Sequence, residues 1–191
     1  PRWSLTDGLV LRLALDDAAS AANSEVNFVP GRMERAFAPR AAHGDDVAAP
    51  LAVGDVAGFG YTDAFTLSAW IRPDAPGRGT LISKMTDVPQ GDGYCLQLVD
   101  GKLQFLLVKR WLDDALRVES RGGVTPNQWQ HVAVVYDGSR LASGVTFYVN
   151  GEQLERVVQL DGLNQTITTK EPLRIGGGGG PQAVFAGAID E

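Results

Sequence analysis

Two pairs of adjacent carboxylates are the first candidates for chemistry in this sequence. They are Asp113–Asp114 and Asp190–Glu191. Glycoside hydrolysis uses two carboxyl groups that face each other across one sugar ring. Neighbouring residues of a strand point to opposite faces of a sheet, so neither pair can converge on one ring. We therefore expect the protein not to be an enzyme, with a glycoside hydrolase as the less favoured alternative.

A ligand-binding site is a second candidate, and it would centre on Trp111. The segment from Lys109 to Asp114 places this indole between cations and carboxylates. A tryptophan ring offers a stacking face for a sugar, and the charged groups offer hydrogen-bond donors and acceptors for hydroxyl groups. Two further residues lie in expected loops near it. The candidate ligand-binding residues are Arg110, Trp111, Asp113, Asp114, Arg140 and Asn164. In the alternative interpretation, Trp111 packs over the edge of the fold while Arg110 and Asp113 form a structural ion pair.

Histidine and cysteine chemistry is not expected. Cys95 is the only cysteine and lies in the apolar run Tyr94–Leu98, which predicts a buried, unreactive thiol. His131 shares the face of an alternating run with Trp129, which favours a packed histidine at the core edge over a catalytic base. One cysteine and two histidines supply no zinc pattern.

The elements that position these residues follow from alternation of apolar and polar side chains, the period of a half-buried strand. The expected strands are Leu9–Asp16, Phe65–Arg72, Thr80–Lys84, Tyr94–Leu98, Lys102–Leu107, Leu116–Ser120, Trp129–Tyr136, Val145–Val149, Leu173–Gly176 and Phe185–Asp190. Asp100–Gly101 and Asn150–Gly151 are residue pairs that supply positive φ angles in tight hairpins. Many short antiparallel strands predict two sheets packed face to face.

The remaining segments carry weaker signals. Ala18–Ala22 is alanine-rich and could form a short helix, and the region from about Glu25 to Tyr61 has scattered proline, glycine and aspartate. Gly176–Gly180 is predicted to be a flexible loop, because no Lys-Ser/Thr follows it as in a phosphate loop. No boundary divides residues 1–191, so we expect one domain.

Composition excludes several classes of function. The 191 residues carry a net charge of −6 with no basic cluster, so nucleic acid is not an expected partner. No apolar run approaches the roughly 18 residues of a membrane span, so no membrane insertion is expected. The sequence begins at Pro1 without a signal peptide, and we expect it to be a piece of a longer product.

The segment Phe65–Pro73, FTLSAWIRP, resembles the "FTLSAWI+P" strand of laminin-G-like and pentraxin-like domains. Further motifs of these domains follow in the same order over nearly the whole chain: Thr80–Lys84, Gly93–Leu98, Asp100–Leu103, Gln128–Gly138, Phe147–Gly151, Pro172–Gly176 and Gly187–Glu191. The resemblance implies an all-β fold, a two-sheet antiparallel β-sandwich of the jelly-roll, concanavalin A-like kind. In the family a final strand follows the last motif, and this sequence lacks it.

A narrower resemblance bears on context. Four segments are similar to a subgroup embedded in large exported bacterial proteins that also carry c-type cytochrome-like and uncharacterised domains: Ser83–Asp87, Lys109–Glu119, Leu163–Thr166 and Thr169–Ile175. It implies an extracytoplasmic module that contacts neighbouring domains of its parent chain. We expect a non-catalytic recognition module that binds a polysaccharide or glycoprotein. The alternative is a protein-interaction or spacer domain without a sugar ligand.

The resemblance also implies a structural calcium ion. In this superfamily an ion often joins the first strand to the last, and the matching residues are Asp16 and Asp190. Calcium takes carboxylate and carbonyl oxygens, and carbonyls near Gly44–Asp46 could complete the shell. The alternative is that both aspartates are turn-forming or capping acids. For a second acidic loop, Asp87 with Gly91–Gly93, a solvated turn is favoured over an ion site.

Overall fold

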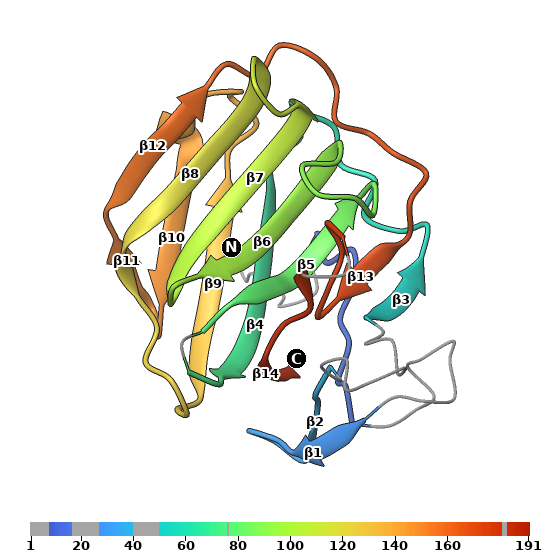
Figure 1. Cartoon of the computed structure of the whole chain (residues 1–191), viewed down its shortest axis with the longest axis vertical. Helices are drawn as coiled ribbons and strands as arrows, with labels where there is room; N and C mark the ends of the chain where they lie inside the picture. The colour runs from blue at the N-terminus through green and yellow to red at the C-terminus, as the bar shows by residue number, and fades with distance from the viewer. Residues whose placement is uncertain (1–7, 17–26, 40–49, 76, 181–182) are drawn as a thin grey trace.

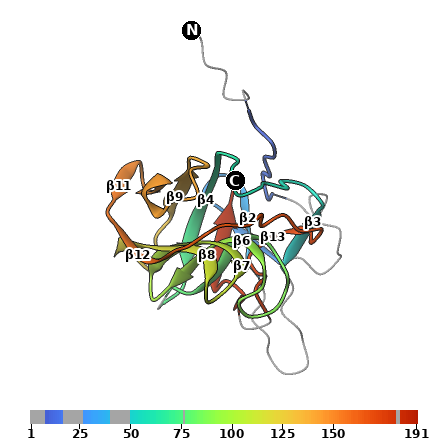
Figure 2. The same cartoon turned by 90° about the horizontal axis from the view of Figure 1, so that it is seen from above.

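The computed structural model describes residues 8–16, 27–39, 50–75, 77–180 and 183–191. Two antiparallel sheets of seven strands each lie face to face (Figures 1 and 2). The first sheet, in spatial order, consists of β1 (Phe28–Pro30), β2 (Arg35–Phe37), β14 (Gly187–Asp190), β4 (Phe65–Pro73), β9 (Gln130–Tyr136), β10 (Val145–Val149) and β11 (Glu152–Leu154). The second consists of β12 (Arg156–Asp161), β8 (Asp114–Gly123), β7 (Lys102–Arg110), β6 (Gly93–Val99), β5 (Gly79–Met85), β13 (Leu173–Ile175) and β3 (Leu51–Gly54). The predicted all-β sandwich is confirmed.

The hairpin turns form for the reason that their sequences predict. Asp100 and Gly101 have φ angles of 50° and 77°, and Asn150 and Gly151 have φ angles of 51° and 83°. Positive φ at both central positions matches the twist of the flanking strands. The Asn150 side chain adds a further bond, because its Oδ1 accepts the backbone N–H of His131 at 2.9 Å. These turns fix the registers of β6 with β7 and of β10 with β11.

The core lies between the two sheets and is built from the inward-facing half of each strand. Phe65 occupies its centre: its ring stacks on Phe59 at 4.4 Å between centroids and meets Tyr94, Phe105 and Tyr136 within 5.9 Å. Burial of such aromatic side chains is the main driving force for closing the sandwich. The two tyrosine hydroxyls are not left unpaired, since Tyr94 donates to the carbonyl of Ala57 and Tyr136 to that of Tyr61.

The predicted strand Leu9–Asp16 is wrong as a strand. The segment keeps the expected alternation, with Leu11, Leu13 and Leu15 packed against the core, but it belongs to neither sheet. β14 pairs with β4 only as far as Asp190 opposite Trp70, so β14 does not cover the half of β4 from Phe65 to Ala69. A cavity of about 670 Å³ separates that half of β4 from the segment. A strand needs a hydrogen-bonding neighbour about 4.8 Å away, and the described residues supply none here.

The region from about Glu25 to Tyr61 carries β1, β2 and β3, although its sequence gave no clear strand signal. The exposed strands β11 and β12 were likewise not expected. The alanine-rich segment Ala18–Ala22 lies outside the described residues, as does the loop Gly44–Asp46. Across the part of the chain that the structure describes, no α-helix occurs, and no helix there has the length and apolar character to cross a membrane.

The glycine run connects β13 towards β14 and lies against β5. Gly176, Gly178, Gly179 and Gly180 have positive φ angles. The loop is held by two buried hydroxyls: Ser83 Oγ donates to the carbonyl of Gly177 at 2.7 Å, and Thr80 Oγ1 donates to that of Gly178 at 2.9 Å. A Cβ at position 178 would lie 2.1 Å from Ser83 Oγ, so glycine is required for this close approach.

Candidate functional site

A row of polar side chains crosses the outer face of the second sheet, over β6, β7 and β8. Gln97 lies opposite Gln104, and Gln104 lies opposite Glu119. Gln97 Nε2 donates to Gln104 Oε1 at 3.0 Å, and Gln104 Nε2 donates to Glu119 Oε2 at 2.7 Å. Gln159 of β12 extends the row by donating to the same Glu119 oxygen at 3.2 Å. We call these four residues, Gln97, Gln104, Glu119 and Gln159, the polar row.

Glu119 is the acceptor on which the polar row converges. Its side chain is 15% exposed, and its second oxygen accepts Lys102 Nζ at 3.1 Å. Burial by itself would raise the pKa of Glu119, but the hydrogen bonds from Gln104 and Lys102, with the Lys102 charge, together lower it. Glu119 is therefore ionised near neutral pH and fixes the orientation of the neighbouring amides.

Sequence reasoning did not identify the polar row, although one signal for it was present. The Asp100–Gly101 turn pairs Val99 with Lys102. Two residues further from the turn on each strand, Gln97 is then opposite Gln104. The position of Glu119 could not be found in this way, because the register of β7 with β8 shifts at two irregularities.

Trp111 lies in the turn between β7 and β8, at one end of the same outer face. It is partly buried and packs with Leu160 against a small apolar cluster of Met85, Cys95, Leu106, Val108 and Ala115. The guanidinium carbon of Arg117 lies 4.2 Å from the centroid of the indole. The ring is therefore held in place on one sheet face and retains a partly exposed surface.

The other predicted ligand-binding residues have different environments. Arg110 and Asp113 form an exposed ion pair, with Nε 3.0 Å from Oδ1 and side chains that are 59% and 66% exposed. Asp113 and its hydrogen bond raise the pKa of Arg110. Asp114 is 1% exposed, and its Oδ1 accepts the backbone N–H groups of Asn164 and Gln165. The structure thus brings Asn164 to Asp114 and uses this carboxylate to anchor the loop after β12.

Arg140 lies in a separate region. Its guanidinium is 5.7 Å from the ring centroid of Tyr61, and its backbone N–H donates to the Tyr136 hydroxyl at 2.8 Å. Among the described residues, no hydrogen bond, ion pair or cation–π contact joins Arg140 to Trp111. The outer face of the second sheet therefore combines Trp111 with the polar row, and Arg140 is not part of it.

The predicted calcium ligands both reach the turn between β1 and β2. Asp190 Oδ2 accepts the backbone N–H groups of Arg32 and Met33 at 2.8 and 3.0 Å, and Asp16 Oδ1 accepts that of Arg35 at 3.0 Å. Asp190 is fully buried, and its Oδ1 has no partner. A buried carboxylate oxygen without a partner suits a hard cation. Nevertheless, the described residues contain no cluster of three or more His, Cys, Asp or Glu side chains that could hold a metal.

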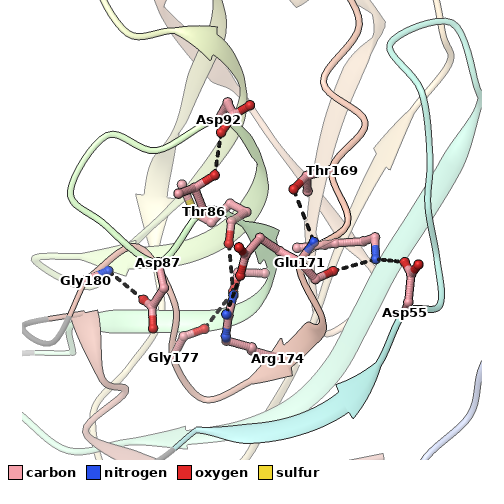
Figure 3. Close-up of polar contacts among 12 residues, drawn as sticks. Asp55, Thr86, Asp87, Asp92, Thr169, Glu171, Arg174, Gly177 and Gly180 are labelled. Carbon is pink, nitrogen blue, oxygen red and sulfur yellow. Dashed lines mark hydrogen bonds and ion pairs between the residues drawn. The ribbon is translucent and has the colours of Figure 1, made fainter.

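A second polar cluster surrounds the end of β5 (Figure 3). The buried Lys84 Nζ donates to Asp55 Oδ1 and to the carbonyl of Glu171, both at 2.7 Å. Arg174 bridges Glu171 and the carbonyl of Met85. Asp87 Oδ1 accepts the N–H of Gly180 at 2.9 Å, and Asp92 accepts the Thr86 hydroxyl (Figure 3). Because these groups are paired within the fold, the cluster holds the surrounding loops in place and has a structural role.

Two ionisable residues, the buried Cys95 and the partly buried His131, pack against neighbouring side chains. Cys95 is 1% exposed, and burial raises the pKa of its thiol to about 12. His131 packs edge-on against Trp70, with ring centroids 5.4 Å apart, and burial lowers its pKa. A neutral thiol and a neutral, packed imidazole fit the structural roles that their sequence positions predict.

Two antiparallel sheets packed face to face, with an open polar and aromatic outer face, define a lectin-like β-sandwich. A family comparison agrees: residues 44–191 match the laminin G model described as the concanavalin A-like lectin/glucanases superfamily. The chain belongs to this superfamily, and the resemblance seen in its sequence motifs is confirmed at this level. No curated protein matches the sequence closely enough to be reported as a relative.

Several solved structures are similar to this chain at low sequence identity. One is the CBM40 module of the Ruminococcus gnavus IT-sialidase bound to alpha2,3 sialyllactose, at 15% identity and a TM-score of 0.53, covering 68% of this chain and 73% of that one. A second is the LG4-5 domains of the mouse laminin alpha1 chain, at 15% identity and a TM-score of 0.47, covering 70% of this chain and 35% of that one. A third is the SAP-like pentraxin of Limulus polyphemus, at 19% identity and a TM-score of 0.48, covering 69% of this chain and 63% of that one.

Proposed function

We propose that this domain is a non-catalytic carbohydrate-binding module whose ligand lies on the outer face of the second sheet. The observation that carries the proposal is the polar row beside a partly exposed Trp111. Fixed planar amides and a carboxylate present donors and acceptors to sugar hydroxyls, and the indole offers an apolar stacking face. The similarity in fold to a sialidase CBM40 module that binds sialyllactose is consistent with this use of the sandwich.

An open sheet face suits binding better than catalysis. The candidate carboxylates do not face each other across a cleft: Asp113 is paired with Arg110, and Asp114 is buried beneath Asn164. Glu119 accepts hydrogen bonds from three donors, and no second carboxylate pairs with it among the described residues. These positions support the proposal of a module without hydrolytic activity.

The test is a screen of the isolated domain on a glycan array, with calcium and with a chelator. We expect binding that Trp111→Ala weakens at least tenfold while the melting temperature stays within a few degrees of the wild type. Trp129→Ala is a matched control, because Trp129 is also partly exposed but lies on the first sheet face, over Arg72. Absence of binding to every glycan in both conditions would favour the alternative, a spacer or protein-interaction domain.

The location and the cation are parts of the same proposal. We propose an extracytoplasmic module of a larger exported bacterial protein, which the subgroup motifs Ser83–Asp87 and Lys109–Glu119 support. We also propose that a calcium ion binds at Asp190 Oδ1, with Asp16 beside the same turn. The unpartnered buried oxygen of Asp190 supports the ion. Such an ion would tie the end of β14 to the β1–β2 turn.

A further inference from the structure

Arg117 differs from the other cations on the outer face of the second sheet. It lies on β8 between Leu106 of β7 and Leu160 of β12, in a row that continues to Cys95. Its guanidinium covers the Trp111 ring at 4.2 Å. Lys102 and Arg174 on the same face each have a carboxylate partner, Glu119 and Glu171. Among the described residues, Arg117 makes no ion pair, and its Nε is buried without a hydrogen-bond partner.

The acceptors of the polar row already accept hydrogen bonds from other donors. Glu119 is two residues along the same strand, but its oxygens already accept Lys102, Gln104 and Gln159. The side-chain oxygen of Gln104 accepts Gln97. A guanidinium is always charged and carries five donors, and the buried Nε of Arg117 is one donor left without an acceptor, which is unfavourable in the free protein. The contact with the indole offsets only part of this cost.

We infer that Arg117 is the specificity-determining residue of the sugar site and that the ligand is an acidic saccharide whose carboxylate binds its guanidinium. This inference rests on the proposed function and names the class of its ligand. The planar fork of arginine matches a carboxylate in a two-point hydrogen bond. Trp111 lies against the guanidinium, and the amides of the polar row remain for the hydroxyl groups of the same sugar.

Binding assays on the whole chain separate this inference from the proposed function. The probes are sialyllactose and trigalacturonic acid, with lactose and maltotriose as uncharged partners. We expect at least one acidic probe to bind tenfold or more tightly than its neutral partner, and Arg117→Gln to abolish that preference. Arg121→Gln is the matched control, because Arg121 lies on the same strand but is exposed and paired with Glu155. Raising the salt concentration should weaken only the acidic probes.

A stability measurement distinguishes a ligand role from a structural one. If Arg117 is held without a partner for the sake of a ligand, Arg117→Met should fold and melt at the same or a higher temperature than the wild type while losing the acidic probes. A large fall in melting temperature would overturn the inference, as would equal binding of acidic and neutral probes. Preference for sulfated over carboxylated sugars would also overturn it. Failure of every glycan to bind would instead remove the proposed function.

Discussion

Replacing Glu119 by Gln changes the charge at the centre of the polar row and almost nothing in its shape. Glu119 accepts hydrogen bonds from two amides, at 2.7 and 3.2 Å, and from Lys102 at 3.1 Å. A hydrogen bond to a charged group contributes about 1.5–3 kcal/mol and a neutral one about 0.5–1.5 kcal/mol, so each amide bond loses roughly 1 kcal/mol. The pair with the half-exposed Lys102 contributes about 0–1 kcal/mol.

Not all of this loss reaches the measured free energy of unfolding. A neutral amide is less costly to bury than a carboxylate, which offsets part of the change. We therefore expect Glu119→Gln to destabilise the domain by about 1–2 kcal/mol at pH 7. For a chain of this length, that corresponds to a fall of about 3–6 °C in melting temperature.

The pH dependence gives the sharper test. The folded-state pKa of Glu119 lies below its ordinary value of 4.5. Its contribution is therefore complete above the unfolded-state pKa and is lost as the pH falls through the lower folded-state pKa. The difference between wild type and Glu119→Gln should be constant from pH 8 to about 5.5 and should narrow towards pH 4, as measured by urea unfolding.

A matched variant tests the reasoning about burial. Glu155→Gln removes an exposed carboxylate whose partner is Arg121; the two side chains are 77% and 69% exposed. It should change the free energy of unfolding by only a few tenths of a kcal/mol. Equal effects of the two substitutions, or a Glu119→Gln effect that is the same at pH 7 and pH 4, would refute the account of the polar row.

Three further predictions concern groups away from the polar row. Cys95, with its pKa raised to about 12 by burial, should react with a thiol reagent at pH 8 at least a hundredfold more slowly in the folded than in the unfolded protein, and similar rates would contradict its burial. Burial lowers the folded-state pKa of His131 below the unfolded value of about 6.5. Its neutral form therefore contributes stability above that pH, and the contribution is lost as the pH falls. His131→Gln should flatten the dependence of the unfolding free energy on pH below about 6.5, and an unchanged slope would disprove this account. Calcium should raise the melting temperature of the wild type by a few degrees over a chelated sample but leave Asp190→Asn unaffected, whereas identical wild-type curves would remove the proposed ion.

The sequence predicted the fold where local signals and tertiary contacts agree. β4, β9 and β10 combine period-2 alternation with β-branched and aromatic residues, and the tight turn at Asn150–Gly151 fixes how β10 pairs with β11. β12 escaped prediction because it is an exposed edge strand, whose burial pattern carries no alternation. The segment Leu9–Asp16 shows the reverse case. It has the pattern of a strand, but pairing depends on a neighbour that the pattern cannot supply.

The candidate site was predictable only in part. Trp111 could be identified because an aromatic residue between charged residues can be recognised in the sequence alone. The burial of Asp114 could not be foreseen, because it depends on a loop fifty residues away that supplies the N–H of Asn164. Arg117 gave no signal at all in the sequence. What distinguishes it is the lack of a partner, which appears only when the registers of β7, β8 and β12 are known.

The hairpin at Asn150 has a consequence for the chemical ageing of the protein. An asparagine followed by glycine is prone to deamidation in a mobile chain, since the next backbone nitrogen attacks the side-chain amide. Here the side-chain oxygen of Asn150 accepts the backbone N–H of His131, and the backbone N–H of Asn150 donates to the carbonyl of His131 at 2.7 Å. Attack requires both bonds to open, so the rate of deamidation at Asn150 should report how often this end of the first sheet opens locally.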